Sequence, residues 1–292
     1  MPFHFKKTES PAKAVRRVCR ERIGAALEQL QESSRPAAVH GVRKEIKKLR
    51  AIFRLVRGEI GRDVYRKGAK ALRAAAGSLT ATRDARATLK AFKTLTGRFA
   101  GRFTEIEKAL TKHCRKEAHQ FQKHDLVARA DRILRKTGRR VGDWKIAASG
   151  WAAIEPGLRE SYRRGREACR LAGRKPSPEN FHEWRKQVKD LWHYFRLLQA
   201  AWPPKMLAMM DGLELLGEQL GDDHDLFLLA QFVAENWAGQ AGEAKALCRM
   251  VELRQKKLRR AALKLGFRLY AATPADICRR LENCWNAWHK AG

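Results

Sequence analysis

Apolar residues recur along the chain at three- and four-residue spacing, which is the period of an α-helix with one buried face. No run of alternating β-branched residues is long enough to predict a strand. Proline lies at or near six expected helix starts, often behind a capping hydroxyl, because the first turn of a helix tolerates the missing N–H. These starts are Ser10-Pro11, Arg35-Pro36, Pro156, Ser177-Pro178, Pro203-Pro204 and Thr273-Pro274. The pattern predicts an all-α protein of about ten to twelve helices joined by short connections.

Glycines predict where several of these helices end or bend. The positions are Gly58, Gly61, Gly77, Gly138, Gly142, Gly173, Gly221 and Gly266. The least helical stretch runs from residue 137 to residue 156, where glycines and a proline gather near the middle of the chain. We therefore predict two units, residues 1–142 and residues 143–292.

An internal repeat supports this division. Val39–Leu49 aligns with Phe181–Leu191, and Leu79–Asp84 aligns with Leu220–Asp225 at an offset changed by one residue. Two segments that match in the same order and at nearly the same separation indicate a duplication. The sequence thus predicts two copies of one helical unit, packed as a pseudo-twofold pair.

Composition points to the kind of partner. The chain has 292 residues, with 62 Lys+Arg against 31 Asp+Glu, so its formal net charge is +31, and 44% of its residues are hydrophobic. This apolar content excludes a disordered polybasic tail. The six cysteines are scattered without a CxxC pair, no apolar run is long enough for a spanning helix, and the first ten residues lack a signal-like apolar segment. We expect a folded cytoplasmic protein with a polyanionic partner and no membrane partner.

The first repeat helix carries positive charge along one face and apolar residues along the other. At 100° per residue, its cations lie within about 80° of His40, whereas the acid Glu45 points well away. The second repeat helix has the same division. The two predicted binding faces comprise His40, Arg43, Lys44, Lys47, Arg50 and Arg54, and His182, Arg185, Lys186, Lys189, His193 and Arg196.

These faces differ from ordinary solvated helix faces. Glu–Lys pairs at i,i+4 stabilise a helix, whereas like charges at that spacing destabilise it. The pairs Arg43–Lys47 and Arg185–Lys189 are like-charged and occupy matching positions in the two copies. The pattern favours a ligand-binding face. Basic stripes on neighbouring helices extend the candidate binding set to Arg20, Arg73, Arg163 and Arg166.

The two repeat helices resemble the signature helices of the CHAD family, whose name denotes a histidine-bearing α-helical domain. The matching patterns are His40-x-x-Arg43-Lys44-x-x-Lys47 and His182-x-x-Arg185-Lys186-x-x-Lys189. Tyr162–Arg166 is similar to the basic helix that precedes the second signature helix. The resemblance implies two antiparallel four-helix bundles with a basic groove between them that binds inorganic polyphosphate. It also implies a location at polyphosphate granules. Many members are fused to a triphosphate-hydrolysing CYTH domain, which we do not expect within these 292 residues.

The chemistry of the residues fits such a ligand. Arginine offers bidentate donors to phosphate oxygens and lysine a point charge, and binding through them is strongly salt-dependent. His40 and His182 either donate hydrogen bonds to phosphate or only support their neighbours; the sequence leaves both roles open. We expect Asp84 and Asp225 to orient a neighbouring Arg or Lys. We expect non-catalytic binding with no cofactor and no resident metal ion.

Two other functions stay open. A metal-dependent enzyme that processes polyphosphate or triphosphate would need acidic ligands, and Asp222–Asp225 is the only dense acidic cluster. A nucleic-acid-binding protein would need aromatic side chains among the cations for base stacking. Here Trp184, Phe195 and Phe53 fall on the apolar faces, and only Trp192 lies near the edge of a basic stripe.

Overall fold

The computed structural model describes residues 3–31, 36–77, 79–97, 99, 101–123, 126–237 and 242–290. Within these ranges the regular structure is helical throughout, which confirms the all-α prediction. The α-helices are α1 (Pro11–Gln31), α2 (Pro36–Leu55), α3 (Arg57–Ile60), α4 (Arg62–Gly77), α5 (Thr80–Thr96), α6 (Thr104–Lys123), α7 (Leu126–Val141), α8 (Glu155–Arg174), α9 (Pro178–Leu197), α10 (Pro204–Asn236), α11 (Glu243–Leu269) and α12 (Pro274–Lys290).

All six prolines predicted to start helices do so. Five of them are the first residue of their helix, and Pro156 is the second residue of α8. At α9 the hydroxyl of Ser177 accepts a hydrogen bond from the backbone N–H of Asn180 at 3.3 Å. This bond satisfies one of the N–H groups that the first turn leaves without a partner.

The predicted helix ends were correct only in part. Gly77 ends α4 and Gly142 follows α7, but Gly221 and Gly266 lie inside α10 and α11. Gly266 has a packing role, because a Cβ atom there would lie 2.3 Å from Cζ2 of the buried Trp184 side chain. The glycine lets α11 approach α9 closely, so it permits contact between helices rather than ending one.

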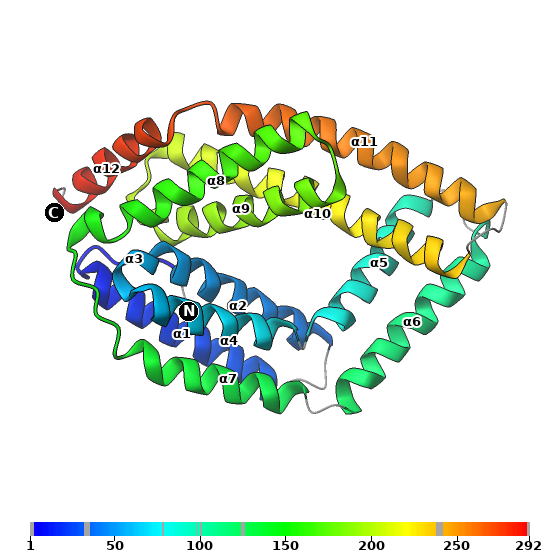
Figure 1. Ribbon diagram of the computed structural model, residues 1–292, viewed down its shortest axis with the longest axis horizontal. Helices are drawn as coiled ribbons and strands as arrows, with labels where there is room; N and C mark the ends of the chain where they lie inside the picture. The colour runs from blue at the N-terminus through cyan, green and yellow to red at the C-terminus, as the bar shows by residue number, and fades with distance from the viewer. Residues whose placement is uncertain are drawn as a thin grey trace.

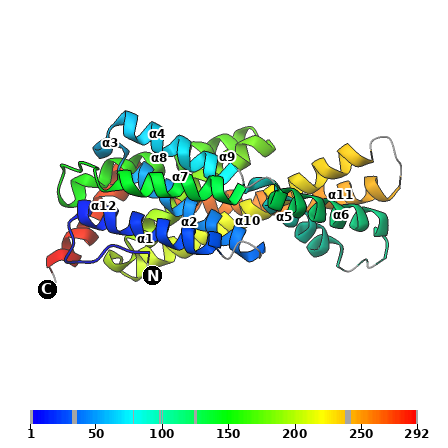
Figure 2. The same cartoon turned by 90° about the horizontal axis from the view of Figure 1, so that it is seen from below.

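The helices form two groups joined by long extensions. Helices α1, α2, α4 and α7 pack together, and α8 packs with α9, α11 and α12, while α10 lies against α9 and α11 (Figure 1). Helices α5 and α6 leave the first group and meet the far ends of α10 and α11, which gives the narrower lobe in Figure 2. None of the helices among the described residues is long and apolar enough to cross a membrane.

The apolar core follows this arrangement. One cluster of buried side chains includes residues from both sequence halves, such as Ile46 and Leu49 of α2 with Trp184 and Phe195 of α9. A smaller cluster joins α5 and α6 to α10 and α11, and includes Phe92 and Leu229. The two halves therefore share a core. Their division at residue 142 and their pseudo-twofold relation stay predictions.

Candidate functional site

The two repeat helices lie side by side with the same direction. Arg54, in the last turn of α2, forms an ion pair with Asp190 in the second half of α9. Nearer the N-terminal ends, Lys47 of α2 lies within electrostatic reach of Arg185 and Lys189 of α9. The buried apolar stripes of both helices fix these orientations, so their cationic faces meet at one place.

Five cations gather where α2 and α9 approach α5. We call this group the basic cluster. It comprises Arg43 and Lys47 of α2, Arg83 of α5, and Arg185 and Lys189 of α9. Since α2 and α5 belong to the first repeat and α9 to the second, folding unites cations that are far apart in the sequence.

Most cations of the basic cluster form no ion pair with a described residue. Among the described residues, Lys47, Arg185 and Lys189 form no ion pair, and the buried Nε of Arg185 has no hydrogen-bond partner. Arg43 donates to the carbonyl of Ala76 at 2.9 Å and to the hydroxyl of Thr80 at 2.8 Å, both neutral acceptors. Carboxylates do lie within electrostatic reach: Asp84 of Arg43 and of Arg185, and Glu214 and Glu218 of Lys189. None of them forms an ion pair with these cations, so among the described residues the cluster holds cations that no carboxylate contacts directly.

Two carboxylates hold the remaining cation, Arg83. Its guanidinium lies 3.0 Å from Asp84 Oδ1 and 3.1 Å from Asp225 Oδ1, so it joins α5 to α10. Both acids thus contact one arginine at the edge of the cluster, and they fix the position of that arginine.

Burial and the crowding of like charges affect the titration of Lys47 in the cluster. Burial and the nearby Arg185, Arg43, Arg83 and Lys189 lower the pKa of Lys47 to about 7. The Lys47 side chain is nevertheless exposed. A side chain that is both accessible to solvent and closely surrounded by protein lies in a concave surface, where an anion can reach it.

Three histidines border the cluster. The rings of His182 and His224 lie 4.2 Å apart, centroid to centroid, and Nδ1 of His182 is buried without a hydrogen-bond partner. Burial and nearby cations lower the pKa of His40 and of His182, and burial together with His182 and Arg185 lowers the pKa of His224 to about 3. All three are therefore neutral at neutral pH in the free protein.

Glycines on α10 make room for the cations of α9. A Cβ atom at Gly217 would lie 2.9 Å from Cε of Lys189, and one at Gly221 would lie 3.3 Å from a terminal nitrogen of Arg185. Gly221, predicted to end or bend a helix, is thus a place where the side chain of Arg185 passes close to the surface of α10.

A hollow of about 300 Å³ opens beside the cluster. It lies along α5, with His40 of α2 and Asp225 of α10 at its borders. The cationic residues Arg83, Arg86 and Lys90 line it. An anion in this hollow would lie beside His40, in the N-terminal part of α2.

Several predicted binding residues lie elsewhere or are already paired. The prediction that His193 binds the ligand was wrong. Its side chain is 7% exposed and packs edge-on against the ring of Phe3, so His193 belongs to the core. Burial and neighbouring cations also keep its pKa well below the usual value. The helical projection placed His193 near the boundary of the basic face, and the N-terminal segment covers that boundary.

Other cations of the predicted set are neutralised locally. Arg54 pairs with Asp190, and Lys186 pairs with Glu183 one turn earlier. Arg163 contacts Glu160 at 2.7 Å and Glu167 at 2.6 Å. These acids neutralise cations that were predicted to bind a ligand.

The remaining predicted residues lie around the cluster or away from it. Lys44 is exposed beside His40, and Arg50 lies between Arg43 and Arg54 with Arg73 of α4 within electrostatic reach. Arg166 donates to the carbonyl of Tyr270 at 3.1 Å, Arg196 lies 5.2 Å above the ring of Trp192, and Arg20 lies beside Gly142.

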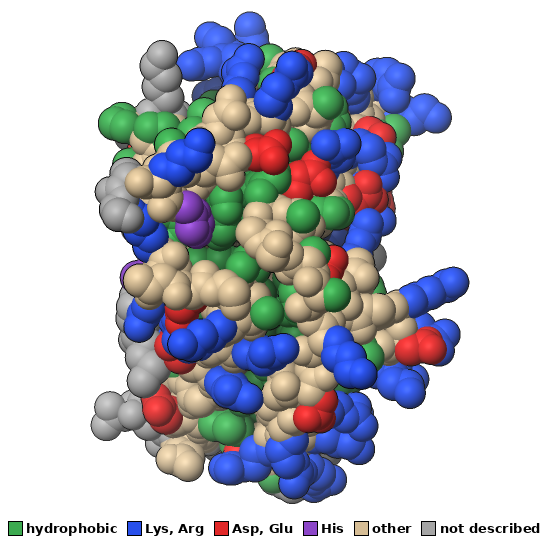
Figure 3. All heavy atoms as spheres, turned by 90° about the vertical axis from the view of Figure 1, so that its left-hand side faces the viewer, with side chains coloured by type: hydrophobic (Ala, Val, Ile, Leu, Met, Phe, Trp, Pro, Cys, Tyr) green, Lys and Arg blue, Asp and Glu red, His purple; other side chains and the backbone are tan. Residues whose placement is uncertain are grey.

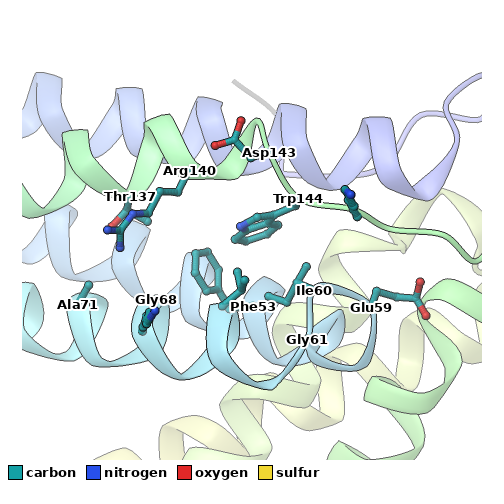
Figure 4. Close-up of a pocket in the computed structure, with 13 residues that line it drawn as sticks. Phe53, Glu59, Ile60, Gly61, Gly68, Ala71, Thr137, Arg140, Asp143 and Trp144 are labelled. Carbon is teal, nitrogen blue, oxygen red and sulfur yellow. The ribbon is translucent and has the colours of Figure 1, made fainter.

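Two other surfaces differ from the cluster. A hollow of about 540 Å³ lies between α4 and the end of α7, where Phe53 and Trp144 form much of its wall (Figure 4). It contains none of the predicted binding residues. At the end of the molecule near α3 and α12, Lys and Arg side chains are interspersed with acids (Figure 3).

Two residues of the site, Arg83 and His224, were not among the predicted binding residues. Both lie in the second repeated segment, where the alignment placed Arg83 opposite His224. That correspondence was a usable signal, because the structure brings both residues to Arg185.

Fold and site together define an all-α protein in which cations from two repeated helices converge. The chain belongs to the CHAD domain family, which matches residues 14–234. It is similar in structure to PptA from Streptomyces chartreusis, with a TM-score of 0.68 and 14% identity over 89% of this chain and 100% of that chain. It is also similar to the CHAD domain from the plant Ricinus communis, with a TM-score of 0.66 and 17% identity over 93% and 97%. No curated protein matches the chain.

Proposed function

We propose that this CHAD protein binds inorganic polyphosphate, without transforming it, in a basic groove centred on the cluster between α2 and α9. The observation that carries the proposal is a set of convergent cations, Lys47, Arg185 and Lys189, that have no ion pair among the described residues. A polyanion supplies the missing negative charge. Membership of the CHAD family supports polyphosphate as that polyanion.

The donor set suits phosphate oxygens. Arg43 and Arg185 supply planar donors that can engage two oxygens at once, and Lys47 and Lys189 supply point charges between them. Release of counterions from a linear polyanion adds to the affinity and makes it depend on salt concentration. Such binding selects a chain of charges rather than a single shaped molecule.

Binding without catalysis is favoured by the state of the nearby acids. Asp84 and Asp225 contact Arg83, and Asp223 pairs with Arg259 at 2.7 Å. Carboxylates held by arginines serve to position those arginines. Incubation with polyphosphate and Mg²⁺ should release no phosphate; steady release would contradict a binding role.

Nucleic acid is the main competitor, and the aromatic residues argue against it. Trp184 and Phe195 are fully buried and Phe53 is 2% exposed, so none can stack on a base. Trp192 is half-buried, with Lys189 4.7 Å and Arg196 5.2 Å from its ring centre.

A competition titration tests the proposal. Labelled long-chain polyphosphate is bound to the protein, and unlabelled polyphosphate, DNA or RNA is added at equal phosphate concentration. We expect polyphosphate to displace the label at much lower concentration than either nucleic acid. Equal displacement by all three would show that the protein has no specificity for polyphosphate, and absence of binding would overturn the proposed function.

We further propose a cytoplasmic location at polyphosphate granules, which fluorescence of a tagged protein in cells containing granules can check.

A further inference from the structure

A second hollow continues the one beside the basic cluster. It measures about 530 Å³ and lies between α5, α10 and α11. Both hollows have Ala87, Lys90 and Asp225 in their walls, so they adjoin along α5. Together they run from Thr82 to Leu95, which at the 1.5 Å rise of an α-helix is about 20 Å.

The walls of this second hollow carry cations that the sequence analysis did not single out. Lys90 of α5 and Arg254 and Lys257 of α11 are exposed, and with Arg86 they form a row that leads away from Arg83. None of these four forms an ion pair with any residue in the described ranges. Many other exposed arginines do have a partner; Arg135 and Arg164, for example, pair with acids one turn away on their own helices.

One acid interrupts the row. Asp222 is exposed in the same hollow and lies within electrostatic reach of Arg254 and Lys90. It forms no ion pair with a described residue, and Asp225 beside it is engaged with Arg83. An anion that enters this hollow would therefore meet three cations and one free carboxylate.

We propose that the hollow between α5, α10 and α11 is a second anion subsite, formed by Lys90, Arg254 and Lys257, that holds the part of a polyphosphate chain extending beyond the basic cluster. The inference rests on the proposed function and adds a ligand class to it: chains long enough to span both hollows. A chain that fills only the basic cluster does not reach Arg254 and Lys257, so the second subsite contributes affinity for long chains alone.

The test compares two double variants with the same loss of charge on the same helix. Arg254→Ala/Lys257→Ala removes cations that line the hollow. Lys256→Ala/Arg260→Ala removes two exposed cations of α11 that do not line it. Each protein is titrated with tripolyphosphate and with long-chain polyphosphate at several salt concentrations. All four substitutions are on the exposed surface, and circular dichroism checks that the helices are retained.

We expect Arg254→Ala/Lys257→Ala to weaken binding of long-chain polyphosphate about tenfold and to lower the salt slope by about two, one for each lost contact with phosphate. Its affinity for tripolyphosphate should stay unchanged, and the control variant should change neither. Asp222→Asn should tighten long-chain binding, because it removes a repulsive charge from the path.

The outcomes separate the two claims. If both double variants affect long-chain binding equally, the effect is one of net charge and the second subsite is overturned. Equal losses for tripolyphosphate and for long chains would also overturn it, because both ligands would then occupy the same cations. If the unmodified protein binds neither ligand, the proposed function fails and the inference with it.

Discussion

The basic cluster and helix α8 are both rich in arginine, but they differ in how their charges are balanced. On α8, Arg163 and Arg164 contact Glu160, and Arg159 contacts Glu155 on the preceding turn. In the cluster, Lys47 lies near Arg185 and Lys189 across a helix interface. Arg185 lies near Arg83 and within electrostatic reach of Asp84 and Asp225, but it forms no ion pair with a described residue. The number of positive charges is therefore a poor guide to a binding site. A better guide is whether acids of the same fold already neutralise them.

This difference has an energetic consequence. Paired charges on an exposed helix contribute a few tenths of a kcal/mol each and leave little attraction for another ion. Unpaired like charges at close range raise the free energy of the folded protein until an anion arrives. The cluster therefore carries an unfavourable repulsion that a bound polyanion would relieve.

The difference between the two regions is tested most strongly by removing two positive charges from each and comparing the affinity for polyphosphate. Arg185→Ala/Lys189→Ala should weaken polyphosphate binding about a hundredfold or more, because each charge-assisted hydrogen bond contributes about 1.5–3 kcal/mol. Arg163→Ala/Arg164→Ala removes the same charge and should change the affinity less than about threefold. Isothermal titration calorimetry measures both. Similar losses for the two variants would show that only net charge matters.

The pH dependence of binding should come mainly from Lys47. In the free protein the pKa of Lys47 is about 7, and a bound polyanion raises it, so binding takes up a proton. Affinity is then greatest below pH 7 and falls as the pH rises through the higher pKa of the complex, by about tenfold between pH 7 and pH 9. Lys47→Arg should bind well and lose most of this dependence, since arginine stays charged. An unchanged pH profile in Lys47→Arg would exclude Lys47 as its source.

Stability should respond in opposite directions in the two regions. The folded-state pKa of Lys47 lies below its ordinary value of 10.5, so its unfavourable effect is complete below pH 7 and disappears as the pH rises towards 10.5. Lys47→Met should therefore raise the Tm of the free protein at pH 6 by about 2 °C, and by less at pH 9. Arg164→Met breaks an ion pair and should not raise it. Calorimetry in the absence of phosphate tests this; a lower Tm for Lys47→Met at pH 6 would contradict the stored repulsion.

The smallest expected effect concerns the space beside Arg185. A Cβ atom at Gly221 would lie 3.3 Å from the Arg185 guanidinium, so Gly221→Ala should shift that side chain by a few tenths of an ångström. We expect about a twofold loss of affinity for polyphosphate. Gly24→Ala on α1, where nothing lies within 4 Å, is the matched control and should have no effect. Tighter binding by Gly221→Ala would show that the packing of Arg185 is loose.

The fold could be predicted largely from local signals. Proline at the helix starts and apolar residues at helical spacing are properties of single segments, so they identified the helices. Gly221 and Gly266 were predicted to end or bend a helix, but neither ends one, and each is instead in close contact with a side chain from another helix, Arg185 or Trp184. A contact between two helices that are distant in the sequence cannot be recognised from the spacing of residues within either helix.

The site, like the fold, could be predicted only where its residues form a pattern within one helix or within the repeat. The cationic faces of α2 and α9 were visible as helical periodicities, and the repeat related them to each other. The acid that pairs with Arg54 was not visible, because Asp190 reaches it across the interface between the repeats. His193 was assigned to the wrong face because residues near the N-terminus cover it, and Phe3 is 190 positions away in the sequence. Arg254 and Lys257 carry no repeat signal at all.

A structure of the protein with long-chain polyphosphate tests the central claim most directly. We predict phosphate groups between α2 and α9, within hydrogen-bond distance of Arg43, Lys47 and Arg185. Phosphates bound only along the paired arginines of α8, with the space between α2 and α9 left open, would contradict it.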